Sequence, residues 1–161
     1  MSEPTQKPGQ SEQIVGTPPQ FIDAVERQFG PITWDLAALS SNRVRQVGWF
    51  GPGSPDGEDA LVQPWHNHTR GLQWLNPGFG KIGQWAAKCR EEGAKGASIA
   101  MLVPLSSSNW ARDYVHGRAL VLGLNPRLKF IGHRIVFPKD LMLCLYGPGF
   151  TPGFTIWQWN R

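Results

Sequence analysis

Residues 71–103 read GLQWLNPGFGKIGQWAAKCREEGAKGASIAMLV, and in them short apolar runs alternate with a helical repeat. The pattern predicts a strand at Leu72–Leu75, a helix at Lys81–Glu92 and a strand at Ser98–Val103. A strand, a helix and a strand in this order indicate a βαβ unit, whose two strands are parallel. The helix has one apolar face, formed by Ile82, Trp85, Ala86 and Cys89.

The same alternation continues on both sides of this unit. Downstream, we expect a helix at about residues 109–117 and a strand at Ala119–Leu124. Upstream, we expect a helix that has Thr17 as its N-cap, prolines in its first turn and Gly30 at its end, followed by a strand at Ile32–Leu36. The whole pattern predicts an α/β fold with a mostly parallel sheet and helices on both faces.

Two segments are less regular. Leu128–Trp159 contains short strands divided by Gly and Pro, and we expect it to add antiparallel edge strands. Between Ser40 and Arg70 the periodicity is lost, and we expect Gly48–Gly57 to form a long irregular loop. Gly51 and Gly53 lie in this loop, but their spacing is not that of a GxGxxG turn between a strand and a helix, which argues against a dinucleotide site.

Length and composition favour one folded unit. The chain has 161 residues, 40% of them hydrophobic, which is enough for one core and too short for two ordinary domains. Residues 1–16 have almost no large apolar side chains, so we expect a disordered tail there and a single domain over residues 17–161. The sequence contains no run of about 18 apolar residues and no signal-peptide pattern, which favours a soluble, intracellular protein.

Cysteines and histidines give no signal of a metal site or a disulfide. Cys89 and Cys144 each lie in an apolar segment, where a free thiol behaves as a small hydrophobic group. His66 and His68 lack further Cys or His residues at the spacing of a metal centre. We therefore expect no metal and no disulfide.

The positive charge is concentrated in the C-terminal third. Residues 1–109 carry nine Lys or Arg against ten Asp or Glu, a net charge of −1, whereas residues 110–161 carry seven against two, a net charge of +5. A basic face beside a near-neutral body suits a phosphate-backbone partner, because each contact with a phosphate releases counterions. A solvated face that only keeps the protein soluble would have the same charge.

The residues after the predicted strands are the places to look for a site, because ligands of open parallel sheets bind beyond the carboxyl ends of the strands. Four segments qualify: Asp35–Ala38, the loop containing Asp59, Asn76–Gly80 and Pro104–Ser108.

Asn76-Pro77-Gly78-Phe79 is the most informative of these segments. The amide oxygen of Asn76 and the carbonyl of Pro77 can both accept hydrogen bonds from an NH₂ group, and Phe79 offers a ring on which a base can stack. The same four residues could also form a plain turn between a strand and a helix.

The order of motifs along the whole chain resembles that of the phage-type DNA N6-adenine methyltransferase family, from about Thr17 to Trp159. The matching segments are Thr17-Pro18, Phe29-Gly30-Pro31, Asp35-Leu36-Ala37-Ala38, Asp59-Ala60-Leu61 with Trp65, Asn76-Pro77-Gly78-Phe79 with Ile82 and Trp85, Met101-Leu102-Val103-Pro104, Trp110, Gly132-His133-Arg134-Ile135-Val136-Phe137 and Thr155-Ile156-Trp157.

The resemblance implies a Rossmann-like methyltransferase fold and S-adenosylmethionine as cofactor. Thr17 and Pro18 resemble the family's cofactor-entry motif, Asp35 resembles the acid that ends its first cofactor-binding strand, and Asp59 resembles the acid near the cofactor's adenine. Each acid could equally be an ordinary turn or loop residue.

The catalytic motif carries one departure from the family pattern. Asn76, Pro77 and Phe79 resemble the Asn-Pro-Pro-Tyr motif, but Gly78 stands where the family has its second proline. Glycine leaves φ unrestricted where proline fixes it, so we expect a less rigid loop, and this puts the rate in doubt.

The implied reaction is direct transfer of a methyl group to N6 of adenine in DNA, with the target base flipped out of the helix and no covalent nucleophile. Such a protein would act in the cytoplasm of a bacterial host. Trp49, in the irregular loop, is a candidate for base stacking. The candidates for contact with DNA phosphates are Arg127, Lys129, His133 and Arg134, on a hairpin at Leu128–Phe137.

Two other functions remain open at this point. A catalytically weak or inactive DNA-binding protein could keep the methyltransferase scaffold, and Gly78 favours that alternative. A methyltransferase acting on small molecules or protein glutamine amides could also use an Asn-Pro-x-aromatic motif, although the basic C-terminal third argues against it.

Overall fold

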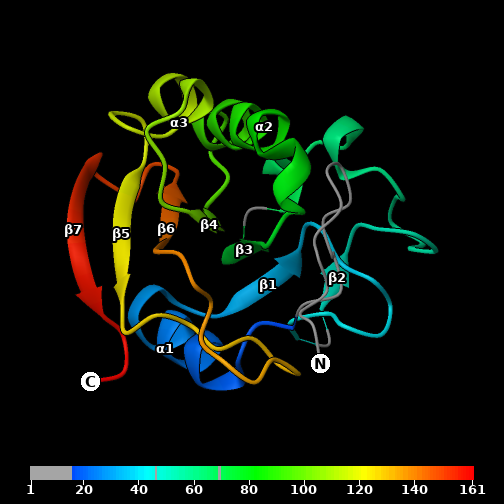
Figure 1. Cartoon of the computed structure of the whole chain (residues 1–161). Helices are drawn as coiled ribbons and strands as arrows, with labels where there is room; N and C mark the ends of the chain where they lie inside the picture. Colours follow the sequence, from blue (N-terminus) through cyan, green and yellow to red (C-terminus); the bar gives the residue numbers. More distant parts are fainter. Residues whose placement is uncertain (1–15, 46, 69) are drawn as a thin grey trace.

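The computed structural model describes residues 16–45, 47–68 and 70–161, and within these residues the chain forms a seven-stranded sheet in the order β2-β1-β3-β4-β6-β5-β7 (Figure 1). The expected tail at residues 1–16 lies outside the described residues except for Gly16. The strands are β1 (Ile32–Asp35), β2 (Gly48–Trp49), β3 (Leu72–Leu75), β4 (Ile99–Pro104), β5 (Leu120–Asn125), β6 (Leu141–Tyr146) and β7 (Gly153–Gln158). The helices are α1 (Pro19–Phe29), α2 (Ile82–Ala94) and α3 (Asn109–Tyr114), with short 3-10 turns at Ala60–Val62, His66–His68 and Phe79–Lys81.

The sheet is mostly parallel, as predicted, and its exception is β6. The pairs β2–β1, β1–β3, β3–β4 and β5–β7 are parallel, whereas β6 runs antiparallel to both of its neighbours, β4 and β5. The C-terminal segment thus adds an antiparallel strand to the sheet, as predicted, but that strand does not lie at an edge. The antiparallel strand β6 lies inside the sheet, where its six residues are all buried, and the edge strand β7 is parallel to β5.

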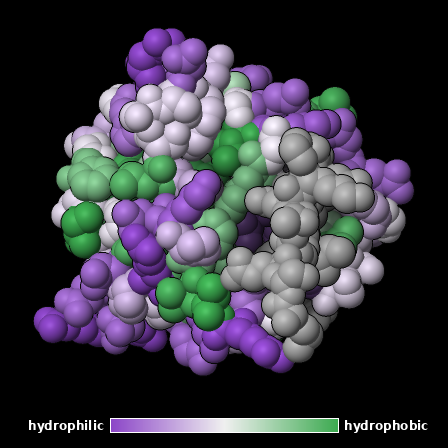
Figure 2. Space-filling view, in the orientation of Figure 1, coloured by the Kyte–Doolittle hydropathy of each residue, from purple (hydrophilic) through white to green (hydrophobic). Residues whose placement is uncertain are grey.

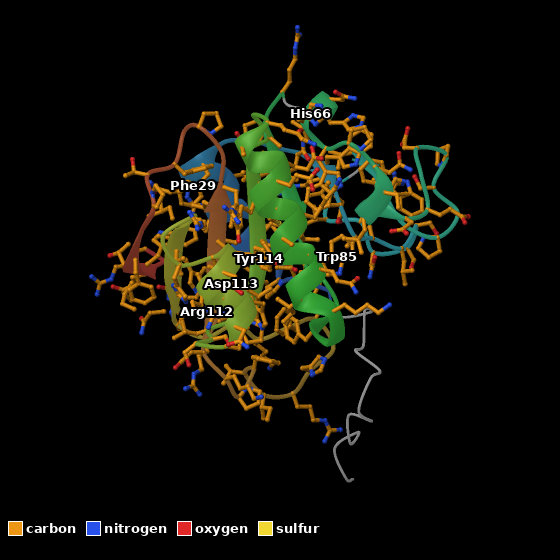
Figure 3. The ribbon with its side chains drawn as sticks, turned by 90° about the horizontal axis from the view of Figure 1, so that it is seen from above. Phe29, His66, Trp85, Arg112, Asp113 and Tyr114 are labelled. Carbon is orange, nitrogen blue, oxygen red and sulfur yellow. The ribbon has the colours of Figure 1, made fainter. Side chains whose placement is uncertain are left out.

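Helices cover both faces of the sheet, which confirms the layered architecture expected from the sequence. In Figure 1, α1 lies on one side of the strands and α2 and α3 lie on the other. Alternate residues of β4 divide between the two cores: Ala100 and Leu102 pack in the α1 layer, and Ile99, Met101 and Val103 in the α2 layer. Seen from above in Figure 3, α2 and α3 run side by side, with Trp85 on α2 and Tyr114 on α3.

A buried carboxylate attaches the irregular segment before β3 to α2. Glu92 is 1% exposed and accepts hydrogen bonds from the backbone N–H groups of Trp65 and His66 at 3.0 and 2.9 Å. Lys88 Nζ lies 3.0 Å from the same carboxylate, and His66 Nδ1 lies 2.7 Å from it. Burial raises the pKa of Glu92, but the hydrogen bonds from His66 and Lys88 outweigh it and hold the pKa at about 2.

His68, Cys89 and Cys144 have structural roles in the fold. His68 stacks on Trp34, with ring centroids 4.1 Å apart, and the two cysteines, Cys89 and Cys144, are free and buried. Across the part of the chain that is described, His, Cys, Asp and Glu form no group of three that could hold a metal ion. None of the helices in that part has the length and apolarity needed to cross a membrane.

Four local predictions are corrected. Trp49 is not a mobile stacking residue, because it lies in β2 and is 6% exposed. Thr17 is not the N-cap of α1: that position is Pro18, and Thr17 makes a different contact. The segment Leu128–Phe137 contains no strands, and is a loop closed at its base by the hydrogen bond from Phe137 N–H to Leu128 O. The helix expected to reach residue 117 ends at Tyr114.

Candidate active site

A cavity of about 410 Å³ opens at the carboxyl ends of β1 and β3, the edge of the sheet where ligands were expected. Its volume lies within the range of small-molecule pockets. It is lined by Gly16, Thr17, Pro19, Ile22, Asp35, Ala37, Ser41, Asn42, Arg43, Val44, Arg45, Trp74, Asn76 and Ile131. The structure thus brings together three residues predicted from separate motifs, namely Thr17, Asp35 and Asn76.

Asp35 is the buried acid of this cavity. It is 4% exposed, and its two carboxylate oxygens accept hydrogen bonds from the backbone N–H groups of Ala37, at 3.3 Å, and Val44, at 2.9 Å. Burial raises the pKa of Asp35 to about 6, while the hydrogen bonds from Val44 and Ala37 and the charge of Arg43 oppose this rise. Asp35 is therefore mostly ionised at neutral pH and holds the segment that follows it against the cavity.

Asn76 directly follows β3 and lies on the cavity wall. Its Nδ2 donates a hydrogen bond to Thr17 Oγ1 at 3.2 Å, although the two residues are 59 positions apart in the chain. Asn76 Oδ1 accepts no hydrogen bond from the described part of the chain. The amide is therefore held by its nitrogen and has its oxygen available for a donor outside the protein.

The three residues after Asn76 form the turn into α2. Pro77 is buried, and Gly78 has φ −61° and ψ 135°. This φ is the value at which a proline ring holds the backbone, so the glycine adopts here the conformation that the family's proline would impose. We expect a looser loop because glycine leaves φ unrestricted. The conformation that Gly78 adopts in the fold is nevertheless one that proline could also adopt.

Phe79 is partly buried and contacts both hydrophobic cores. Its ring meets that of Phe137 edge to face, with centroids 5.9 Å apart, and Phe137 meets Phe130 in the same way at 5.6 Å. Phe130 and Phe137 belong to the loop between β5 and β6. The aromatic contacts therefore join the base of that loop to the Asn76 turn.

The loop between β5 and β6 carries the predicted basic residues beside the cavity. Lys129, His133 and Arg134 are exposed, and Arg127 is exposed but paired with Asp140 at 2.9 Å. Ile131 lines the cavity and its backbone N–H donates to Gly16 O at 2.9 Å. In Figure 2 strongly hydrophilic surface borders small hydrophobic patches in the lower part of this face, where Figure 1 places the loop.

Asp59 is not brought to the cavity. Its carboxylate accepts a hydrogen bond from Leu61 N–H at 3.0 Å and caps the 3-10 turn at Ala60–Val62. It does not line the cavity that holds Asp35 and Asn76. Its assignment to the cofactor's adenine remains a prediction that this geometry neither tests nor requires.

Sequence reasoning missed the segment Ser41–Arg45, which forms a wall of the cavity. Val44 is tied to Asp35 by its backbone, and Arg45 is tied to α1 through ion pairs with Asp23, at 2.7 Å, and Glu26. These contacts join residues 9 to 22 positions apart. They leave no periodic signal, and the charges alone would not have indicated which acid each arginine meets.

The fold and site define an α/β protein with a ligand cavity at the carboxyl ends of two parallel strands, and an amide and a buried carboxylate line this cavity. The sequence profile of the DNA N-6-adenine-methyltransferase (Dam) family matches residues 5–137. The chain belongs to this family of DNA adenine methyltransferases. A search of curated proteins finds no match.

The conformation of Gly78 leads to a stability prediction. Because its φ of −61° is already that of proline, we expect Gly78→Pro to raise the free energy of unfolding by about 0.4–1 kcal/mol, through loss of freedom in the unfolded chain. Urea denaturation measures this change. Gly53→Pro is the matched control and should destabilise, because Gly53 has φ +81°. A lower stability for Gly78→Pro would contradict the prediction.

The buried Asp35 predicts a pH dependence of stability. The pKa of Asp35 is raised from 3.8 to about 6, so between these values the folded state keeps a proton that the unfolded state has lost. Stability from this group is fully present below pH 3.8 and is lost as the pH rises through 6, by about 3 kcal/mol at 1.36 kcal/mol per pKa unit. The difference in unfolding free energy between the wild type and Asp35→Asn should fall by about 2–3 kcal/mol from pH 4 to pH 7. A constant difference would mean that Asp35 titrates alike in both states.

Proposed function

We propose that this chain is an S-adenosylmethionine-dependent methyltransferase that transfers a methyl group to N6 of adenine in DNA. The observation that carries the proposal is the amide of Asn76, which is held by Thr17 through its nitrogen at the end of a buried parallel strand, on the wall of a cavity shared with Asp35. Membership of the DNA adenine methyltransferase family supports the choice of substrate.

The residues around the cavity fit the cofactor. The carboxylate of Asp35 can accept hydrogen bonds from hydroxyl or amino groups. Thr17 supplies further polar groups at the cavity wall, namely its hydroxyl and its backbone. When bound, S-adenosylmethionine supplies an electrophilic methyl group. Asp59, outside the cavity, would contribute only if its loop approached the cofactor's adenine.

Asn76 and Pro77 act on the target amine. The side-chain oxygen of Asn76 and the main-chain oxygen of Pro77 accept its two N–H hydrogens, which turns the lone pair of N6 toward the methyl donor. Phe79 gives the flipped adenine a ring to stack on, and its edge-to-face contact with Phe137 holds that ring in place. Orientation of the amine, rather than a covalent intermediate, supplies most of the catalysis.

The chain offers no thiol suited to covalent catalysis. Burial raises the pKa of Cys89 and of Cys144 well above the ordinary range, so both thiols stay protonated. Both side chains lie in the α2 layer of the core. A direct transfer to N6 is the reaction that the remaining groups support.

The DNA backbone would lie along the loop between β5 and β6. Lys129, His133 and Arg134 are exposed there, and the aromatic contacts through Phe137 connect this loop to Phe79. Flipping the adenine costs a few kcal/mol, which contacts with the backbone and stacking on Phe79 would offset. Such an enzyme would act in the cytoplasm of a bacterial host, with a Rossmann-like arrangement of its sheet.

A DNA-binding protein without catalysis is the second candidate, and Gly78 is the feature that favoured it. The φ of Gly78 weakens this alternative, because the turn already has the conformation that proline would give it. A methyltransferase of protein amides is the third, and the exposed basic loop beside the cavity weighs against it.

Removal of the Asn76 amide tests the proposal. Asn76→Ala should lower turnover at least about 100-fold, because the amine loses its orientation, while cofactor binding is kept. The measurement is mass spectrometry of N6-methyladenine in unmethylated DNA incubated with S-adenosylmethionine. Asn160→Ala, at an exposed position near the C-terminus, is the matched control. Equal turnover of Asn76→Ala and the wild type would refute the role of Asn76, and a wild type that binds the cofactor but methylates nothing would favour the non-catalytic alternative.

Salt dependence tests the DNA surface and separates it from the protein-amide alternative. Lys129→Ala and Arg134→Ala should each weaken DNA binding and reduce the slope of log Kd against log salt by about 1. Fluorescence anisotropy with labelled duplex measures both quantities. Lys95→Ala is the control, because its ammonium pairs with Glu91 at the far end of α2. Unchanged slopes in the two loop variants would place the DNA elsewhere on the protein.

A further inference from the structure

The contact between Thr17 and Asn76 is the starting point. Thr17 lines the cavity, and its Oγ1 accepts the hydrogen bond from Asn76 Nδ2 at 3.2 Å. Its hydroxyl is not used to cap α1, since the N-cap is Pro18 and no side chain makes a capping hydrogen bond there. Within the described residues the hydroxyl proton of Thr17 has no acceptor. The side chain of Thr17 therefore accepts a hydrogen bond from the Asn76 amide and has its hydroxyl proton available to donate to another group.

A hydroxyl and an amide can be joined in two ways. In the arrangement seen here, Asn76 Nδ2 donates to Thr17 Oγ1 and Asn76 Oδ1 is left available. With the amide turned over, the hydroxyl would donate to Oδ1, and the NH₂ group would take the place of the oxygen. Only the first arrangement presents an acceptor to the amine of adenine, because the second presents two N–H donors to two other N–H donors.

The hydroxyl proton of Thr17 determines which of these two hydrogen-bonding arrangements forms. A hydroxyl has one donor and two lone pairs, so when its proton is engaged by an acceptor inside the cavity, it can only accept from Asn76. Asn76 must then donate through Nδ2, and its oxygen is fixed toward the target. An acceptor such as the carboxylate of an amino-acid cofactor would have this effect from the cavity side.

We propose that Thr17 is a positioning residue that fixes the Asn76 amide with its oxygen toward the target amine when an acceptor group occupies the cavity. This inference rests on the proposed function of the site, and goes beyond it by making the orientation of the catalytic amide depend on cofactor occupancy. Cofactor bound in the cavity would thereby raise the affinity of the same site for a flipped adenine, and by linkage the reverse would hold.

The first experiment is kinetic and uses the full chain at saturating S-adenosylmethionine. Thr17→Val removes the hydroxyl but keeps the β-branched shape, and should lower kcat about 10- to 100-fold with little change in KM for DNA. Thr17→Ser, which keeps a hydroxyl, should restore most of kcat. Thr33→Val, in β1, is the matched control: among the described residues its hydroxyl donates only to Leu72 O in β3, at 3.4 Å, and its removal should leave kcat unchanged. Wild-type kcat in Thr17→Val would overturn the proposal.

The second experiment needs no turnover. The side-chain NH₂ resonances of Asn76 are assigned by their loss in Asn76→Ala, and are followed by ¹H–¹⁵N NMR as S-adenosylhomocysteine is added. This probe keeps the amino-acid carboxylate and lacks the transferable methyl group. The Asn76 resonances should shift in the wild type and in Thr17→Ser but not in Thr17→Val, while the backbone amide of Val44, on the cavity wall, reports occupancy in all three.

The two readouts separate this inference from the proposed function. If the wild type forms no N6-methyladenine but its Asn76 resonances respond to the probe through Thr17, the coupling stands and the proposed reaction falls. If the wild type methylates DNA while Thr17→Val keeps both its kcat and its Asn76 response, the reaction stands and the coupling is wrong.

Discussion

The parallel pairing of β3 between β1 and β4 is the constraint on which the site depends. All four residues of β3 are buried, including the polar Gln73, whose side-chain Nε2 donates to the backbone oxygens of Trp65 and His68, and the chain becomes partly exposed only at Asn76. Because β1 runs parallel to β3, Asp35 and Asn76 emerge at the same edge of the sheet. The carboxylate and the amide are therefore close in space although they are separated by a long irregular segment.

The two buried carboxylates, Glu92 and Asp35, differ in how fully their hydrogen bonds compensate for burial. Glu92 accepts hydrogen bonds from Lys88, from the side chain of His66 and from two backbone N–H groups, which compensates its desolvation and stabilises the attachment of the irregular segment to α2. Among the described residues, Asp35 accepts hydrogen bonds from two backbone N–H groups and lies near the charge of Arg43, but burial outweighs these effects and its pKa rises. A carboxylate that is incompletely compensated at the wall of a cavity is poised to gain from a donor on a ligand, which is typical of binding sites rather than of structural ion pairs.

The parts of the fold that follow from local pattern were predictable from the sequence. The apolar runs of β3 and β4 and the helical repeat of α2 identified the βαβ unit to within a few residues. The position of β6 was not predictable, because strand order depends on which neighbour a strand pairs with, and Leu141–Tyr146 shows only that it is apolar throughout. Its place between β4 and β5 keeps it inside the sheet, and its alternate residues are buried in the α1 layer on one face and the α2 layer on the other.

The site residues at the ends of predicted strands could be predicted from the sequence. The site residues whose position depends on long-range tertiary contacts could not. Asp35 and Asn76 were found because Asp35 lies at the end of one predicted strand and Asn76 directly follows another, and parallel sheets bind ligands beyond the carboxyl ends of their strands. Thr17 was assigned to the site by resemblance, but the side chain it meets is 59 residues away and could not be inferred from spacing. Ile131 had no signal at all, because a solvent-exposed isoleucine in a basic loop gives no indication that its backbone bonds to Gly16 beside the cavity.

The positive charge of the C-terminal third borders the cavity but does not line it. Of the lining residues, Ile131 comes from that third, whereas the two arginines on the wall, Arg43 and Arg45, come from the near-neutral part of the chain, and the charge of Arg43 opposes the rise in the pKa of Asp35. The exposed basic residues Lys129, His133 and Arg134 lie on the loop between β5 and β6, which contacts the Asn76 turn through the rings of Phe137 and Phe79. These ring contacts fix the position of the loop beside the turn without adding a charge next to the amide, so the basic residues and the polar cavity stay separate parts of one surface.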